Sequence, residues 1–290
     1  MPELPEAEVV ARQIRDRLVG AALTDTWIGR ADIVREGFRE RGWYAGSVLR
    51  SAERFGKSVA LGFERQCETR YIVAELGMTG LLLFPSVRPR FPQHIHVRMR
   101  FSGGLESELR YWNPRRFGRL SMLDPQGLKD YLARRFGCDP LTVSWEEFRG
   151  IVKARSGRLK SLLMHQQIIA GIGNIYANEI LFRACLHPNA RASGLPLGKI
   201  ERLFTVTQEV LREAIACGGS SMRDFFAPDG SEGNFKQRHL VYGKEGAPCP
   251  NACGRAIRRL RGERSSFFCP LCQSRTPLQQ RRGRPTKGFP

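Results

Sequence analysis

The sequence predicts an α+β protein in which an N-terminal helix and a β-rich domain precede a helical domain and a small four-cysteine module. Three observations support this prediction. Short β-branched and aromatic runs recur through residues 20–125, separated by Gly, Pro and polar stretches. From about residue 128 the apolar residues take a helical period. Four of the eight cysteines then lie in two pairs within residues 249–272.

The first predicted elements are a helix and a set of strands. A helix is predicted over residues 5–19, because Val10, Ile14 and Leu18 recur at the spacing of one helical face. Acidic residues precede basic ones in this segment, which matches the helix dipole. The runs that follow are typical of a β-sandwich or a small barrel. They cover residues 59–63, 71–76, 81–84, 94–101, 109–112 and 118–123.

The second half is predicted to be mostly helical. Residues 124–127 (Asp-Pro-Gln-Gly) are predicted to be a linker. Helices are expected over residues 128–136, 145–154, 158–168, 174–184 and 196–217. A Gly-, Ser- and Asp-rich stretch, 218–235, interrupts the helical pattern and is predicted to be a mobile loop. The tail over residues 275–290 is polar and basic and is expected to be disordered.

The charge of the chain points to a polyanionic partner. The formal net charge is +19, and Lys and Arg that neutralise phosphates release counterions. A solvated basic surface is the alternative, but ten basic residues and one acid lie between residue 249 and the C-terminus. No apolar run is long enough to span a bilayer, and the first ten residues carry acids where a secretory signal carries bases. We therefore expect a cytoplasmic protein without a membrane partner.

The clustered cysteines have the spacing of a four-thiolate zinc site. Cys249 and Cys253 form one short turn, and Cys269 and Cys272 form a second. Disulfides are the alternative, which the expected cytoplasmic location disfavours. The pattern contains no fifth ligand, so we expect one structural Zn²⁺, and the arginines between the pairs make this module a candidate DNA clamp. The other cysteines are expected to be reduced thiols: Cys67, Cys138, Cys185 and Cys217.

A glycine turn separates two of the predicted helices. Residues 170–176 read AGIGNIY, in which the glycines permit a tight reversal and Asn174 is a candidate cap for the next helix. A helix N-terminus with free N–H groups binds phosphate well, and Arg155 and Lys160 lie just upstream. An ordinary helix connection is the alternative.

The N-terminus offers a candidate nucleophile. Removal of Met1 exposes the secondary amine of Pro2, which is a usable nucleophile near neutral pH. Glu3 and Glu6 lie beside it, and an amine next to a carboxylic acid can perform iminium chemistry. The alternative is structural, because Pro and acids are also typical of helix starts.

Eight motifs along the chain are similar, in the same order, to those of one known protein family. They are PELPEAE at 2–8, RFGKSVAL at 54–61, ELGMTG at 75–80, NPRRFG at 113–118, QQIIAGIGNIYANEILFRACLHP at 166–188, GGSSMRDF at 218–225, VYGKEGAPC at 241–249 and RSSFFCPLCQ at 264–273. Together they resemble the formamidopyrimidine-DNA glycosylase family. The PELPE start and the long 218–235 loop favour this purine-excising branch over the related endonuclease VIII branch.

The resemblance implies a domain order and a reaction. It implies a catalytic helix and β-sandwich domain at 2–125, a helix-two-turn-helix DNA-binding domain at 128–235 and a zinc finger at 240–274. Damaged duplex DNA would lie in the cleft with the target nucleotide flipped out. Pro2 would attack the sugar C1′ and form a Schiff base, with Glu3 as general acid and proton shuttle. Lys57 would serve β-elimination, and Arg264 would assist δ-elimination at the second phosphate.

The resemblance also implies DNA contacts. Met78, Arg115 and Phe117 would fill the void left by the flipped base, although Met78 and Phe117 are by themselves more typical of core residues. The 218–235 segment would be a loop over the everted base, with Ser220 and Ser221 reading an oxidised purine; a plain connection is the alternative. His94, Arg115, Arg155 and Asn174 match DNA-contacting positions of the family, and Lys160 is a candidate phosphate ligand.

The sequence departs from the family pattern at three places. Asn113 and His165 stand where the family usually has Asp, and three residues rather than two separate Cys249 from Cys253. Asn113 in place of Asp could loosen how Arg115 is held. This change therefore puts the discrimination of the partner base in question. None of the departures touches the implied catalytic residues.

Other interpretations remain at the level of the sequence. The tail motif Arg281-Arg282-Gly283-Arg284-Pro285 resembles the core of an AT-hook; a basic tail that only adds salt-dependent affinity is the favoured alternative. For the whole chain, the alternatives are a glycosylase for oxidised pyrimidines, a non-catalytic zinc-finger DNA-binding protein and an RNA-binding module. We expect a monomer.

Overall fold

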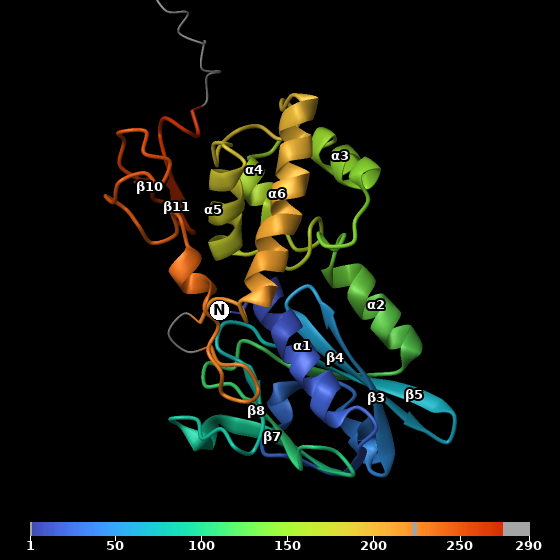
Figure 1. Cartoon of the computed structure of the whole chain (residues 1–290). Helices are drawn as coiled ribbons and strands as arrows, with labels where there is room; N and C mark the ends of the chain where they lie inside the picture. Colours follow the sequence, from blue (N-terminus) through green and yellow to red (C-terminus); the bar gives the residue numbers. More distant parts are fainter. Residues whose placement is uncertain (1, 222–224, 275–290) are drawn as a thin grey trace, which may run out of the picture.

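The chain folds into a β-rich lobe and a helical lobe that meet at the start of the first helix (Figure 1). The computed structural model describes residues 2–221 and 225–274. The first lobe contains α1 (Leu4–Leu18), β1 (Ala22–Ile28), η1 (Ala31–Ile33), β2 (Val34–Glu36), η2 (Phe38–Tyr44), β3 (Ser47–Phe55), β4 (Ser58–Arg65), β5 (Glu68–Glu75), β6 (Leu81–Leu83), η3 (Pro92–His94), β7 (Ile95–Ser102), β8 (Glu108–Trp112) and β9 (Leu120–Leu123). The predicted runs thus correspond to β4–β9, whereas β1, β2 and β3 were not predicted individually.

The helical lobe and the C-terminal module follow. Their elements are α2 (Pro125–Arg135), α3 (Trp145–Lys153), α4 (Leu159–Leu163), α5 (Asn174–Arg183), α6 (Leu197–Ala216), η4 (Phe235–Arg238), β10 (Arg258–Leu260) and β11 (Ser266–Phe268). Across the two described ranges, no helix is long and apolar enough to cross a membrane. Helix α4 is shorter than the predicted 158–168 segment, because the chain turns after Leu163 and the backbone N–H groups of Ile168 and Ile169 both donate to the His165 carbonyl.

Nine strands form one hydrogen-bonded sheet in the order β2-β9-β5-β4-β3-β1-β7-β8-β6. Strand β1 pairs with β3 only at Ala22 and Leu23 but with β7 over most of its length, with a register shift between Leu23 and Asp25. A bulge bends a strand, and the two halves of the sheet enclose one apolar core with α1. This arrangement confirms the predicted α+β fold with a β-sandwich.

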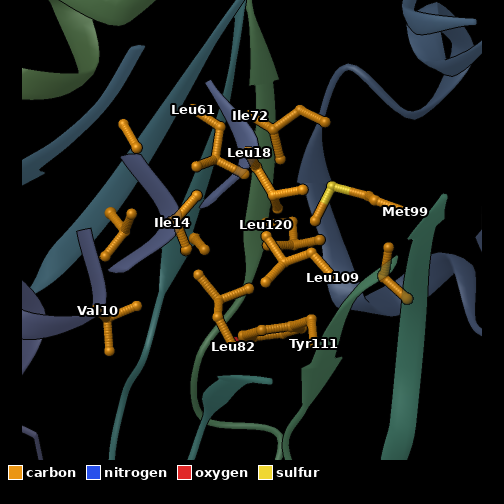
Figure 2. Packing of buried hydrophobic residues seen from close by; sticks show 14 of the residues in the cluster. Val10, Ile14, Leu18, Leu61, Ile72, Leu82, Met99, Leu109, Tyr111 and Leu120 are labelled. Carbon is orange, nitrogen blue, oxygen red and sulfur yellow. The ribbon is translucent and has the colours of Figure 1, made fainter. Parts of the chain in front are cut away.

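The core explains why α1 forms where it does. Val10, Ile14 and Leu18 are fully buried on one face of this helix, which is the face that the sequence predicted. Figure 2 shows these side chains meeting residues of both halves of the sheet. The other labelled residues are Leu61, Ile72, Leu82, Met99, Leu109, Tyr111 and Leu120.

The predicted linker at 124–127 is wrong, because these residues begin helix α2. Asp124 is the N-cap, and its carboxylate accepts a hydrogen bond from the Gly127 N–H at 2.7 Å. Pro125 occupies the first helical turn, where its missing N–H costs nothing. Leu128 and Tyr131 then bury against the sheet. An Asp-Pro pair is typical of a helix start. The apolar residues that follow it then stabilise α2 by packing against the sheet.

The described residues of 218–234 form no helix or strand, as predicted for a loop, but much of the segment packs against the β-rich lobe, while residues 222–224 lie outside the described chain. Phe225 is 3% exposed and packs in the core of the β-rich lobe. The Pro228 carbonyl accepts from the Phe84 N–H at 2.8 Å, and the Asp229 N–H donates to the Gln13 side chain at 3.1 Å. The segment is therefore anchored to α1 and to the end of β6.

Candidate active site and nucleic-acid interface

The carboxylate of Glu3 caps helix α5. It accepts hydrogen bonds from the main-chain N–H groups of Gly173 (2.8 Å), Ile175 (3.0 Å) and Tyr176 (3.3 Å). Pro2 is buried directly before it. The positive end of the α5 dipole therefore holds the Glu3 side chain beside the N-terminal residue.

This arrangement corrects the expected role of Asn174. Asn174 is the first residue of α5 rather than its cap, and Gly173 occupies the N-cap position without a side chain to contribute. The N–H groups expected to be free for phosphate are taken by Glu3. The sequence could not reveal this partner, because Glu3 lies 170 residues from Gly173.

A buried polar network lies behind Glu3. Glu6 accepts hydrogen bonds from the Glu3 N–H at 2.8 Å, the Tyr176 hydroxyl at 2.6 Å and the Ser220 N–H at 2.6 Å. Burial raises the pKa of Glu6, and the nearby Glu3 charge raises it further. Ser220 is 2% exposed, and its hydroxyl lies 2.9 Å from Nε2 of His239. Ser220 is therefore part of the support for the N-terminal segment and does not present a free side chain.

Lys57 lies in the turn between β3 and β4, and it lines a cavity of about 690 Å³. Burial lowers the pKa of Lys57; the charge of Glu3 opposes this shift, and that of Arg264 reinforces it. Three residues from distant parts of the chain thus share one electrostatic environment. The lowered pKa increases the neutral fraction of the amine, which is the form that accepts a proton.

Lys160 holds the segment that carries Arg264. Its ammonium group donates to the carbonyls of Arg264 (3.3 Å) and Ser265 (2.7 Å) and to the Ser266 hydroxyl (2.9 Å). Lys160 is 6% exposed, and burial lowers its pKa to about 8. We expected Lys160 to contact phosphate, but its three donors are directed at protein acceptors. Its groove, about 470 Å³, is also lined by Arg158, His165 and Arg261.

Met78 and Phe117 are exposed and line the Lys57 cavity. They are 39% and 55% exposed, so they are not core residues. The Arg115 guanidinium lies 4.7 Å from the centre of the Phe117 ring. The cavity therefore combines an amine with a flexible thioether, an aromatic ring and an adjacent cation.

The four clustered cysteines converge at one point. Their sulfur atoms all lie within 4.8 Å of one another, with 3.8 Å between Cys249 and Cys272 and 3.5 Å between Cys253 and Cys269. These distances exclude disulfides, whose sulfurs lie about 2.05 Å apart. A tetrahedral ion with metal–sulfur bonds of about 2.3 Å requires sulfur separations of about 3.8 Å. The site thus fits a tetrahedral metal, and the wider first turn closes as expected.

Comparisons with known proteins agree with this geometry. The formamidopyrimidine-DNA glycosylase N-terminal domain matches residues 1–120, and the H2TH domain of the same enzymes matches residues 136–226. The formamidopyrimidine-DNA glycosylase of Thermus thermophilus is 38% identical over 96% of this chain and 100% of its own length. That of Alkalilimnicola ehrlichii is 37% identical over 94% of this chain and 100% of its own.

The chain belongs to the formamidopyrimidine-DNA glycosylase family.

As a member of this family, the protein is a DNA glycosylase and an abasic-site lyase that acts in DNA repair. The crystal structure of the Thermus thermophilus protein superposes with a TM-score of 0.82, at 35% identity over 95% of this chain and 100% of that one. A Lactococcus lactis relative bound to DNA with an abasic site gives a TM-score of 0.81, at 29% identity over 94% and 99% of the two chains.

The remaining predicted DNA contacts of this glycosylase do not form one cluster. His94 lines a separate cavity of about 360 Å³ with Trp27, Arg30 and Arg116. Arg155 turns back, and its guanidinium donates to the Ile151 carbonyl at 3.2 Å. The side-chain oxygen of Asn174 accepts from Asn178 at 3.3 Å. The hydroxyl of Ser221 accepts from the Gly233 N–H at 2.7 Å, which closes the base of the 218–235 segment.

Sequence reasoning missed the residues that act behind the site. Tyr176 and His239 were not predicted, and neither were the hydrogen bonds from Lys160 to the Arg264 segment. The only signal for Tyr176 was its place in the GIGNIY run. The signal for Lys160 was its charge, which cannot distinguish a phosphate from a carbonyl ligand. Both roles depend on segments that are distant in the sequence.

Proposed function

We propose that this protein removes oxidised purines, such as 8-oxoguanine and formamidopyrimidines, from duplex DNA and then cleaves the abasic site. The observation that carries the proposal is the Glu3 carboxylate, which follows buried Pro2 directly and is held by the N–H groups at the start of α5, while the charges of Glu3 and Arg264 both act on Lys57. Relatives support the substrate class: a Lactococcus lactis protein has been solved with Fapy-dG-containing DNA, and MutM with DNA containing carbocyclic 8-oxo-G.

The reaction begins at Pro2. After Met1 is removed, the secondary amine attacks the sugar C1′, the glycosidic bond breaks, and the electron pair leaves with the base. The Glu3 carboxylate accepts the proton that the Pro2 nitrogen loses and passes it to the ring oxygen, which opens the sugar ring and leaves an iminium ion between Pro2 and C1′; the departing base anion takes its proton from solvent. The α5 N-terminus holds the Glu3 carboxylate in place for this transfer.

Strand cleavage then follows by β,δ-elimination. Lys57 serves the β-elimination, which expels the 3′ phosphate. Arg264 assists the δ-elimination, in which the 5′ phosphate leaves and a one-nucleotide gap remains. Because burial lowers the pKa of Lys57 whereas a guanidinium stays cationic, the two groups suit a proton transfer and a phosphate contact respectively.

The DNA must be distorted for this chemistry. A base inside the duplex is inaccessible, so the nucleotide is flipped out. Exposed Met78 and Phe117 would enter the vacated space, and Arg115 would hydrogen-bond the orphaned base. His94, Arg155 and Asn174 would contact the backbone, and the segment containing Ser220 and Ser221 would border the everted base.

We further propose one structural Zn²⁺ in the C-terminal module. Four thiolates favour zinc, and a closed tetrahedron leaves no position for a substrate. The domains would then be residues 2–125, 128–235 and 240–274, with a basic tail at 275–290 outside the described residues. The protein would act as a monomer in the cytoplasm.

The test is borohydride trapping on a duplex with a single 8-oxoguanine. We expect a covalent adduct whose crosslinked peptide begins at Pro2. The control is a variant with one extra residue before Pro2, which converts the nucleophile into an amide and should give no adduct. An adduct on Lys57 instead of Pro2, or none on oxidised-purine and abasic duplexes, would contradict the proposal.

A further inference from the structure

The turn that carries Arg115 and Phe117 is closed by Asn113. The Asn113 side-chain oxygen accepts from the Arg116 N–H at 3.0 Å, and its amide nitrogen donates to the Gly118 carbonyl at 3.1 Å. An N–H can only donate and a carbonyl can only accept, so these two partners fix the orientation of the amide. Asn113 is fully buried.

The backbone of this turn explains why it needs such a clamp. Arg116 has φ of +54°, which lies in the left-handed region that a side chain disfavours. This conformation stands between Arg115 and Phe117 in the sequence, and it brings their side chains together. The bond from the Arg116 N–H to Asn113 therefore supports the residue with the least favourable backbone geometry.

Tyr111 connects this turn to the one that carries Met78. The Asn113 amide donates to the Tyr111 hydroxyl at 3.0 Å, and that hydroxyl donates to the Glu75 carbonyl at 2.6 Å. Glu75 is the last residue of β5, three positions before Met78. The two turns also touch, because a side chain on Gly77 would overlap the Gly118 backbone.

We propose that Asn113 and Tyr111 are positioning residues that set the distance between Met78 and the Arg115–Phe117 pair and thereby determine discrimination of the base opposite the lesion. This inference rests on the proposed function. A guanidinium distinguishes partner bases only if its hydrogen-bond geometry is held constant. The series of hydrogen bonds from Arg116 through Asn113 and Tyr111 to Glu75 holds the turn in this way. None of these hydrogen bonds involves Pro2.

An amide at residue 113 can both accept from the Arg116 N–H and donate to the Gly118 carbonyl, whereas a carboxylate can only accept. A carboxylate at residue 113 would still accept from the Arg116 N–H, but it would face the Gly118 carbonyl with no proton to share. The Tyr111 hydroxyl would have to turn towards the new acceptor and release the Glu75 carbonyl. Relative to the usual Asp, Asn113 thus adds a hydrogen bond to the Gly118 carbonyl that closes the turn.

The test compares Asn113→Asp and Tyr111→Phe with Tyr44→Phe. Tyr44 is a matched control, since it is also fully buried in the same core and donates to the Tyr71 carbonyl at 2.9 Å, away from both turns. The first readout is the ratio of excision rates opposite cytosine and adenine. We expect Asn113→Asp and Tyr111→Phe, the two clamp variants, to change this ratio by about two- to tenfold, which is the range for one lost hydrogen bond. Tyr44→Phe should leave the ratio unchanged.

The second readout needs binding only. A 2-aminopurine placed opposite an abasic analogue reports whether the orphaned base is still held, and we expect a weaker response in both clamp variants. Trapping on abasic-site DNA should stay within about twofold of wild type, because Pro2 is untouched. An unchanged ratio and an unchanged response in both clamp variants, or an equal change in Tyr44→Phe, would overturn the inference. Wild-type protein that fails to trap would contradict the proposed function instead, and the fluorescence response would still decide this inference.

Discussion

The main-chain N–H of Gly173 donates a hydrogen bond of 2.8 Å to the carboxylate of Glu3, 170 residues earlier in the chain. A methyl group at residue 173 would overlap the Glu3 carboxyl carbon. The glycine is thus required by the close approach of a functional side chain, although its own φ of −121° is available to any residue.

Gly173→Ala should inactivate the enzyme without unfolding it. The added methyl group displaces the Glu3 carboxylate from the α5 N-terminus, and a misplacement of about 1 Å costs on the order of a hundredfold in rate. Single-turnover excision measures the effect. Gly150→Ala in α3 is the control, because its methyl group meets no atom within 4 Å. Equal rates for the two variants would show that the contact is dispensable.

Lys160→Met should shift the products of strand cleavage. The variant loses the three hydrogen bonds that fix the Arg264 segment, so we expect the yield of δ-elimination relative to β-elimination to fall by about tenfold or more. Gel analysis of the cleaved ends measures this ratio. Lys153→Met removes a comparable bond to the Leu195 carbonyl (2.8 Å) far from Arg264 and should leave the ratio unchanged. If both variants behave alike, Lys160 does not act through Arg264.

His239 should make the stability depend on pH. Burial lowers the pKa of folded His239 to about 4, and Lys244 and Lys236 add to the shift; the unfolded imidazole has a pKa near 6.5. Between these values the unfolded state binds more protons, so the free energy of unfolding falls as the pH drops from 6.5 towards 4, by up to about 3 kcal/mol. Denaturant titrations of wild type and His239→Gln at several pH values measure this. The difference between the two curves should change with pH; a constant difference would refute the assignment.

Loss of the metal should destabilise the C-terminal module and weaken DNA binding. We expect one zinc per chain by native mass spectrometry, and none in Cys272→Ser. Duplex affinity should fall by about tenfold or more in that variant, because the metal supplies much of the folding free energy of so small a unit. Cys67→Ser, an exposed cysteine outside the cluster, is the control. A full zinc equivalent in Cys272→Ser would contradict the four-thiolate site.

Short-range features were predictable from the sequence. The apolar face of α1, the strands β4–β9 and the two cysteine turns each depend on residues a few positions apart, and the structure confirms them. The resemblance to the family, spread over eight motifs, implied the catalytic residues that the proposed function uses. The error at 124–127 arose because a turn-like composition also suits a helix start, and the packing of 218–235 against the β-rich lobe involves residues distant in the sequence.

The sequence by itself determined the fold class and the pairing of the four clustered cysteines, and it supplied the candidates for the reactive groups, because periodicity, spacing and residue chemistry depend on residues that are close together in the sequence. Only the tertiary structure decided what each reactive group touches: Glu3 caps α5, Lys160 holds the Arg264 segment, and Asn113 supports a left-handed Arg116. These contacts join segments that the folded core brings together, or depend on a backbone angle that no residue type specifies. The charge and hydrogen-bonding groups of a side chain limit what it can bind, and the packing of the folded chain determines which partner lies within reach.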